Sequence, residues 1–271
     1  MSHLAGTGGN VYLATTIIDD CNDDWEDGTH GSAALTTSDY KTGTGAVAIT
    51  GSAVEAGDVL AYEAIAAGAT NYSTFSHVLC WAKCTASVSA NDLVLVLDKD
   101  AGAPSSPESE LNFPALTANV WKYCHLTNVS GKELEDSTAA VTVGLEWSAN
   151  AQDKVVTLDD IRAAKNIAGI NSWTLDYTSD ALETTDFADA GVKSYIIGAS
   201  GWSGSFAGYK DGAPLSMGTI WGIELAESAT ATQMWLGNII ITGIHPSVSA
   251  DGIVSYSYDF QGTNSLMVSS T

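Results

Sequence analysis

Apolar and polar residues alternate along several short stretches of the chain. The clearest stretch is 172–178, where Trp173, Leu175 and Tyr177 alternate with Ser172, Thr174 and Asp176. Because successive side chains of a β-strand point to opposite faces of a sheet, this period of two predicts a strand with one apolar and one polar face.

Similar short runs recur through the rest of the sequence. Gly, Asn, Asp or Ser interrupts the apolar runs every 8 to 12 residues or so, roughly the spacing of turns in all-β proteins. We expect strands within 4–18 and at 46–50, 59–65, 74–85, 93–98, 121–126, 141–147, 155–161, 202–206, 219–225, 234–244 and 254–260. The evenly spaced strands in the middle predict a two-sheet sandwich, with 101–110 as an exposed loop. A short segment of helical character is expected at 187–197, and the polar tail after 260 is expected to be flexible or engaged in assembly.

Composition changes abruptly at two places. From Asp19 the sequence reads DDCNDDWED, six acids in nine residues, and a quieter pattern returns near Ala163. A chain of 271 residues that is 45% hydrophobic is long enough for two domains that each bury a core. The sequence therefore predicts an all-β protein of two β-sandwich domains.

The charge balance argues against two classes of partner. The chain has 32 acidic and 10 basic residues, a formal net charge of −22, and Arg162 is its only arginine. Nucleic-acid affinity comes from Lys and Arg that neutralise phosphates, so we expect neither DNA binding nor attraction to anionic membranes, although solubility alone also favours acidity. Residues 1–10 lack the regions of a signal peptide, and no apolar run approaches about 20 residues, so we expect a soluble protein with no membrane partner.

The cysteines show neither a disulfide framework nor zinc spacing. They are Cys21, Cys80, Cys84 and Cys124. Cys80 and Cys84 fall in one predicted strand, and four residues of strand span about 13 Å, which is beyond disulfide reach. A zinc site that used His77 or His125 would lack the usual C-x-x-C spacing, so we expect buried thiols.

Five segments of the middle region carry a first resemblance. They read IIDDCNDDW, YKTGTGAVAIT, YSTFSHVLCWAKC, FPALTANVWKYCHL and VTLDDI. With them, the region 19–165 resembles the jelly-roll superfamily of carbohydrate-binding modules. In that family the first and last segments approach each other and often hold a structural calcium ion, which prefers several oxygen ligands. The resemblance therefore implies Asp20 with Asp159 or Asp160 as calcium ligands, and Asp19 as a weaker candidate; the alternative is a solvated acidic turn beside an ordinary strand end.

Such modules also stack exposed aromatic rings on sugars. Trp81 and Trp121 both fall in predicted strands, so we expect them to pack in the core. The sequence assigns no sugar-binding face.

Both ends of the chain carry a second resemblance. The residues are GTGGNVYLATTII at the start, then INSWTLDYTSDALETTDF, YIIGASGWSGSFAGYKD and GNIIITGIHPSVSADGIVSYSYDFQGTNSL. These parts resemble the tail tube (major tail) proteins of long-tailed bacteriophages, with Asn264 where that family has a last glycine. The resemblance implies a tail-tube-type sandwich made of 1–18 and 166–271, into which a jelly roll of 19–165 is inserted. The alternative is two tandem domains behind an unstructured first 18 residues.

The tail-tube resemblance also implies a function. We expect a structural virion protein that stacks as hexameric rings with copies of itself, meets other phage tail proteins, and encloses a lumen through which DNA passes without specific binding. The lumen face is expected to carry either the row Ser255, Ser257 and Asp259 or the row Ser203 and Ser205. The jelly roll would lie on the tube exterior, where it could contact host glycans, and assembly would take place in the host cytoplasm.

Other classes of function have less support from the sequence. No nucleophile elbow, HExxH motif, P-loop or Cys–His pair in a motif context is present, so we expect no enzyme. A phage capsid decoration protein and a free-standing carbohydrate-binding protein are the alternatives that the sequence leaves open.

Overall fold

A computed structural model describes residues 9–52, 57–148, 153–186, 192–209, 212–228, 233–250 and 252–270. Apart from one 3₁₀ turn, η1 (Leu134–Asp136), its elements are all β-strands, which confirms the expected all-β class. None of the described residues forms a helix long and apolar enough to cross a bilayer. The chain divides into two compact units, a terminal unit (Met1–Val11 with Ile167–Thr271) and a middle unit (Tyr12–Asn166).

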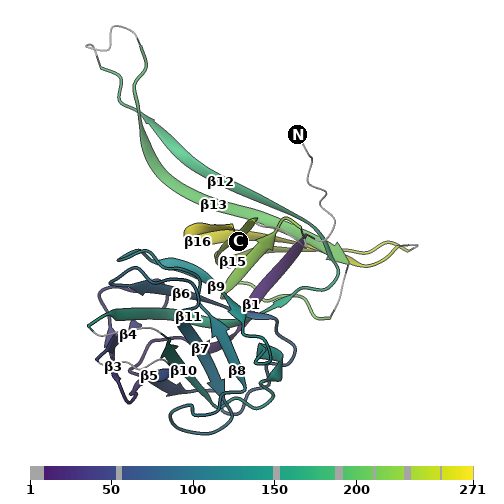
Figure 1. The fold of residues 1–271 in the computed structure, drawn as a ribbon. Coiled ribbons are helices and arrows are strands. Elements are labelled where there is room, and N and C mark those ends of the chain that lie inside the picture. The colour runs from purple at the N-terminus through teal and green to yellow at the C-terminus, as the bar shows by residue number, and fades with distance from the viewer. Residues whose placement is uncertain are drawn as a thin grey trace. The chain divides into compact units, whose positions relative to one another are not determined.

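The middle unit is a two-sheet sandwich (Figure 1). One sheet contains β1 (Asn10–Asp19) from Tyr12 onward, β3 (Gly31–Thr36), β4 (Ala46–Gly51), β6 (His77–Cys84), β9 (Lys122–Asn128) and β11 (Val155–Asn166). The other contains β2 (Glu26–Asp27), β5 (Asp58–Ala64), β7 (Leu93–Asp98), β8 (Ser109–Asn112) and β10 (Thr142–Trp147). A short pairing of β8 with β9 joins the two sheets.

Alternation along these strands builds one core between the sheets. Cys80 and Leu158 enter it from the first sheet, and Leu95, Leu145 and Trp147 enter it from the second. Each of these side chains is at most 1% exposed. Burial of this apolar surface from both sheets is the main term that stabilises the unit.

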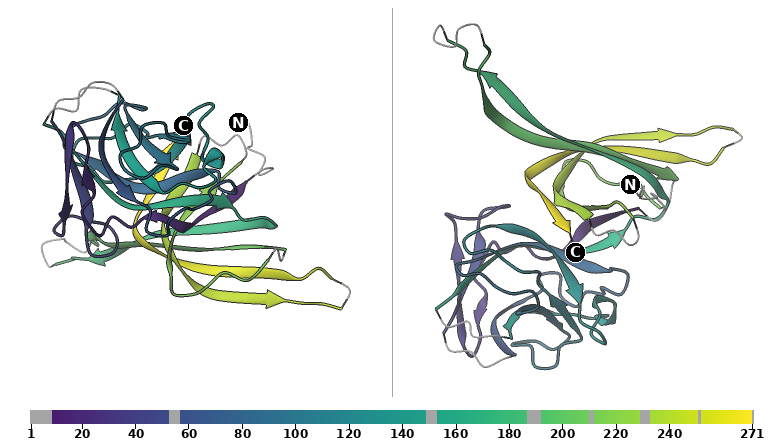
Figure 2. Two further views of the ribbon diagram at one scale, coloured as in Figure 1. Left: turned by 90° about the horizontal axis from the view of Figure 1, so that it is seen from below. Right: turned by 45° about the horizontal axis from the view of Figure 1, so that its top comes forward.

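The terminal unit is a continuous antiparallel sheet of long strands. In spatial order they are β12 (Ile170–Glu183), β13 (Tyr195–Tyr209), β16 (Ser255–Ser270), β15 (Gln233–Ser247) and β14 (Ile220–Ala226). Figure 2 shows that β12 with β13, and β15 with β16, form two extended hairpins of this unit.

The first boundary between the units differs from the one expected. Residues Tyr12 to Asp19 pair with Asn166 to Ile161 of β11, and Ile18 is buried in the core of the middle unit. The boundary therefore follows Val11 rather than Ile18. The acidic run that begins at Asp19 marks the end of a strand and its turn, not the start of a new unit.

Three local expectations also need correction. Residues 109 and 110 lie in β8 rather than in an exposed loop, and most of the polar tail continues β16, where it pairs with β15 from Gln233 onward. Of the segment expected to be helical, 187–191 lies outside the described residues, and Tyr195 to Ile197 belong to β13.

Candidate functional site

Four strands of the terminal unit together present one polar face. Antiparallel partners that lie directly opposite each other share a face of the sheet. The register aligns three rows across β12, β13, β16 and β15. The rows are Asp176, Ser203, Gln261 and Ile240; Thr174, Ser205, Asp259 and Gly243; and Ser172, Ala207, Ser257 and His245. We call these twelve residues the polar face.

The sequence offered two alternative polar rows, and the structure brings both onto this face. Ser205 of β13 lies opposite Asp259 of β16, and Ser203 lies two residues further along the same strand. The two rows are therefore parts of one surface.

The polar face carries negative charge and hydroxyl groups. Asp176 and Asp259 are its carboxylates, and His245 Nε2 lies 2.9 Å from Asp259 Oδ2. The hydroxyls of Thr174 and Ser205 are 3.0 Å apart across the β12–β13 pair. No residue of the polar face is lysine or arginine.

The opposite side of these strands is apolar and holds the sheet in shape. Trp202, Phe206 and Phe260 are each at most 3% exposed, and neighbouring rings among them pack with centroids about 6 Å apart (6.1 and 6.2 Å). Trp202 Nε1 donates a hydrogen bond of 3.0 Å to the carbonyl oxygen of Asn264. Asn264 has a φ of 60°, a left-handed conformation that Asn adopts more readily than most residues with a side chain. A glycine adopts the same conformation without strain, so either residue fits this backbone position.

The far part of the β12–β13 hairpin exposes large apolar side chains. Leu182, Ile196 and Ile197 are 51%, 56% and 87% exposed. Ile196 lies opposite Leu182 in the hairpin register, so their exposed surfaces form one patch. Exposed contiguous apolar surface of this kind is typical of interaction sites. The alternation of apolar and polar residues did not indicate this patch, because the patch is recognised from the exposure of its side chains in the folded chain.

The predicted calcium ligands do not gather as one group. Asp20 lies with Asp19 and Asp23, and their carboxylate oxygens are within 4.8 Å of one another. Burial raises the pKa of Asp19, whose Oδ1 accepts hydrogen bonds from the Cys21 amide at 2.8 Å and from the indole of Trp25 at 3.1 Å. Calcium binding by these acids stays a prediction.

Asp159 and Asp160 have other partners. Asp159 accepts hydrogen bonds from the amides of Lys41 (2.6 Å) and Thr42 (2.9 Å) and from the Thr42 hydroxyl (2.9 Å). Its pKa is nevertheless raised to about 6, chiefly because the carboxylate is buried. Asp160, at a φ of 54°, pairs with Arg162 Nε at 2.5 Å. Both carboxylates thus hold the middle unit together in this structure.

A further acidic residue was missed by the sequence reasoning. Burial raises the pKa of Glu146 on β10 to about 7, and the nearby carboxylates of Glu110 and Asp58 raise it further, while Lys132 acts against them. These residues come from separate segments of the chain, so no local motif signals their proximity.

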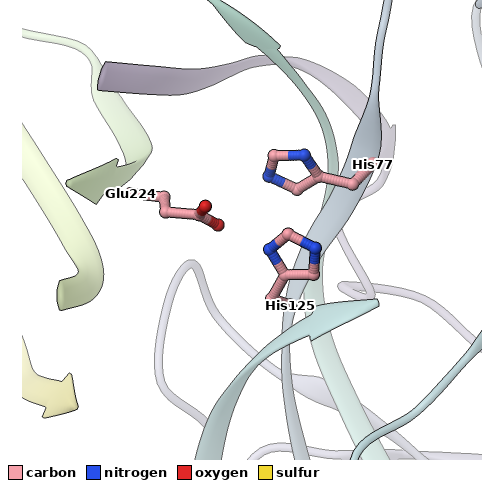
Figure 3. Close-up of side chains that lie close together, drawn as sticks. All are labelled: His77, His125 and Glu224. Carbon is pink, nitrogen blue, oxygen red and sulfur yellow. The ribbon is translucent and has the colours of Figure 1, made fainter. Parts of the chain in front are cut away.

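Two histidines of the middle unit stack on each other. His77 of β6 and His125 of β9 have ring centroids 4.1 Å apart and planes 16° apart (Figure 3). His77 Nδ1 lies 2.9 Å from the Ser76 hydroxyl. The described residues show no cysteine grouped with either histidine as a metal-ligand set, so a cysteine-containing zinc site has no support.

The two tryptophans considered for sugar stacking have different surroundings. Trp81 is fully buried, with Tyr123 packed at a centroid distance of 4.9 Å. Trp121 is partly exposed, and its indole Nε1 donates a hydrogen bond of 2.7 Å to Asp39 Oδ1. Its ring centroid lies 5.4 Å from the Lys83 ammonium nitrogen. Core packing is therefore confirmed for Trp81 only.

No protein-family model and no curated protein matches the chain. Among solved structures, it is similar to the tail of an empty gene transfer agent (GTA) particle of C6 symmetry, with 17% identity, a TM-score of 0.35, and coverage of 40% of this chain and 87% of that chain. A virion of a native GTA particle matches with 16% identity, a TM-score of 0.34, and coverage of 40% and 89%. The N-terminal CBM22-1–CBM22-2 tandem domain of Xyn10C from Paenibacillus barcinonensis matches with 9% identity, a TM-score of 0.36, and coverage of 99% and 100%. At these values the matches assign no family to the chain.

Proposed function

We propose that the chain is a structural virion protein, a tail tube subunit that stacks as hexameric rings. The polar face is the observation that carries this proposal. A conduit for DNA needs a lining that is wetted yet holds no phosphate, and a face with two carboxylates and no lysine or arginine repels a polyanion. In this arrangement the polar face lines the lumen.

The β12–β13 hairpin is the proposed contact with neighbouring copies. Its exposed apolar patch is a surface that an isolated subunit leaves in water, and β12 lies at the edge of the sheet, where strand addition is available. A second copy of the chain is the occupant that closes such an edge in a symmetric ring.

The middle unit is proposed to be displayed on the tube exterior and to contact host glycans. Its first and last residues, Tyr12 and Asn166, are direct register partners on β1 and β11. A unit whose chain ends are adjacent can be inserted at one position of another domain. Its role in the virion is thus separable from the tube wall.

Negative-stain electron microscopy of the purified protein tests the proposal. We expect rings or tubes for the wild type and dispersed subunits for Ile196→Asp, which places a charge in the apolar patch on a side chain that is 56% exposed. Met217→Asp is the matched control, because Met217 is 59% exposed but lies outside the hairpin. Discrete trimers would favour a capsid decoration protein instead, and permanent monomers with glycan affinity would favour a carbohydrate-binding protein.

A further inference from the structure

Two of the four cysteines lie directly opposite each other on neighbouring strands. The register pairs Cys80 of β6 with Cys124 of β9, and both are free thiols with no exposed surface. Opposite residues of an antiparallel pair have Cα atoms about 4.5 to 5.5 Å apart, which lies within the range of about 4.4 to 6.8 Å that a disulfide spans. The register spacing of the two residues is therefore compatible with a disulfide.

The other two cysteines are less suitable partners. Burial raises the pKa of the Cys21 thiol well above its usual value, and the charges of Asp19 and Asp159 and its hydrogen bond to Asp19 raise it further; Cys80 also acts on it, so Cys21 is the competing partner that the experiment must distinguish. Cys84 lies four residues from Cys80 along β6, which is beyond the reach of a disulfide. It also lies two residues beyond Ala82, whose pairing with Lys122 is the last of the β6–β9 ladder. Among the four cysteines, Cys80 and Cys124 are the pair that the register of neighbouring strands places directly opposite each other.

We propose that Cys80 and Cys124 form a modification site, a dithiol that a two-electron oxidant converts into a cross-strand disulfide. Two S–H bonds break and one S–S bond forms. With a diazene such as diamide as the oxidant, the two protons and two electrons pass to its N=N bond and give a hydrazine. The bond would tie β6 to β9 across the sheet of the middle unit, and it does not depend on the proposed tail tube function.

Burial controls how fast this bond closes. Loss of water raises the pKa of the Cys124 thiol to about 12 and raises that of Cys80 well above its usual value. Because the thiolate is the attacking species, oxidation of the folded protein follows local opening of the strands. The dithiol is thus slow to oxidise at rest and faster where the sheet opens.

Peptide mapping of the diamide-treated full chain tests the proposal. The protein is oxidised in buffer and in urea below its unfolding midpoint, its remaining thiols are alkylated, and the digest is analysed without reductant by mass spectrometry. We expect a Cys80–Cys124 linked peptide, alkylated Cys21 and Cys84, faster closure in urea, and a melting temperature that rises on oxidation and falls back with dithiothreitol.

Two variants serve as controls for the peptide mapping, and two results would contradict the proposal. Cys84→Ser should retain the linked peptide, and Cys124→Ser should lose it. A Cys21–Cys80 peptide as the main product, or four alkylated thiols after refolding in the presence of diamide, would overturn the proposal. Since the linked peptide is identified in the wild-type chain, the result stands even if a variant folds poorly.

Discussion

Replacement of Gly262 by alanine should specifically destabilise the terminal unit. A Cβ at Gly262 would lie 2.0 Å from Cε2 and 2.1 Å from Cδ2 of Trp202, which are atoms of the fused ring bond and not the end of a flexible side chain. The same ring also packs closely against Gly237, where an added Cβ would come within 2.5 Å of Cζ2. Trp202 therefore packs directly on two glycines of adjacent strands, β15 and β16.

The cost follows from overpacking and from one hydrogen bond. Forcing extra atoms into a packed core costs about 1 to 3 kcal/mol, and displacement of the ring also endangers the Trp202–Asn264 bond, which is worth about 1 kcal/mol. We expect a loss of about 2 to 4 kcal/mol, which corresponds to a melting temperature lower by about 8 to 15 °C for a unit of this size. Differential scanning calorimetry at low protein concentration measures it, because self-assembly would add concentration-dependent stability.

A matched control and a double-mutant cycle separate this cause from others. Gly201 adjoins Trp202, and a Cβ there meets nothing within 4 Å, so Gly201→Ala should stay within about 0.5 kcal/mol of the wild type. In a Trp202→Phe background the smaller ring leaves room, and Gly262→Ala should then cost much less than it does alone. Strictly additive costs, or a Gly262→Ala variant as stable as the wild type, would refute the packing argument.

Three further predictions concern charge. The pKa of Glu146 is raised from 4.5 to about 7, so its contribution to stability is fully present below pH 4.5 and is lost as the pH rises through 7. Glu146→Gln should therefore flatten the fall in melting temperature between pH 5 and 8. The control Glu135→Gln, at an exposed position, should leave that fall unchanged. Changing both Asp176 and Asp259 to Lys should create salt-sensitive binding to double-stranded DNA in a gel-shift assay where the wild type shows none, and binding unaffected by salt would contradict the electrostatic reason. If the acids of the first turn hold calcium, added calcium should raise the melting temperature, and a chelator or Asp20→Asn should abolish the rise; no response to calcium or chelator removes the site.

Local alternation predicted the strands, but not which strands share a face. The period of two at Ser203 and Ser205, and again at Ser257 and Asp259, is visible within a few residues. That these rows form one surface depends on the register of β13 against β16, which joins residues roughly fifty positions apart, such as Ser205 and Asp259. A shift of one residue in that register would turn one row to the opposite side. The sequence therefore offered two lumen rows as alternatives where the fold has one face.

The residues predicted as calcium ligands show the same limit more sharply. Asp159 receives its hydrogen bonds from Lys41 and Thr42, 118 and 117 positions away, and nothing in the local sequence announces this contact. The β11 register is irregular between Asp159 and Arg162, and Asp160 there adopts a left-handed backbone and pairs with the arginine. An acidic pair at a strand end is equally compatible with a metal site and with such a junction, and the local sequence does not reveal the partners that the fold supplies.

Placement of charge is more informative than its total. A net charge of −22 is common to many soluble proteins and by itself indicates no function. The terminal unit, however, contains Lys193 and Lys210 as its only lysines and no arginine, whereas the other basic residues lie in the middle unit. Lys193 pairs with Glu183 at 3.0 Å at the far end of the hairpin, and neither lysine belongs to the polar face. A face without lysine or arginine, on a unit that has only two lysines, offers a DNA chain no fixed positive charge, and this is the property that the proposed conduit requires.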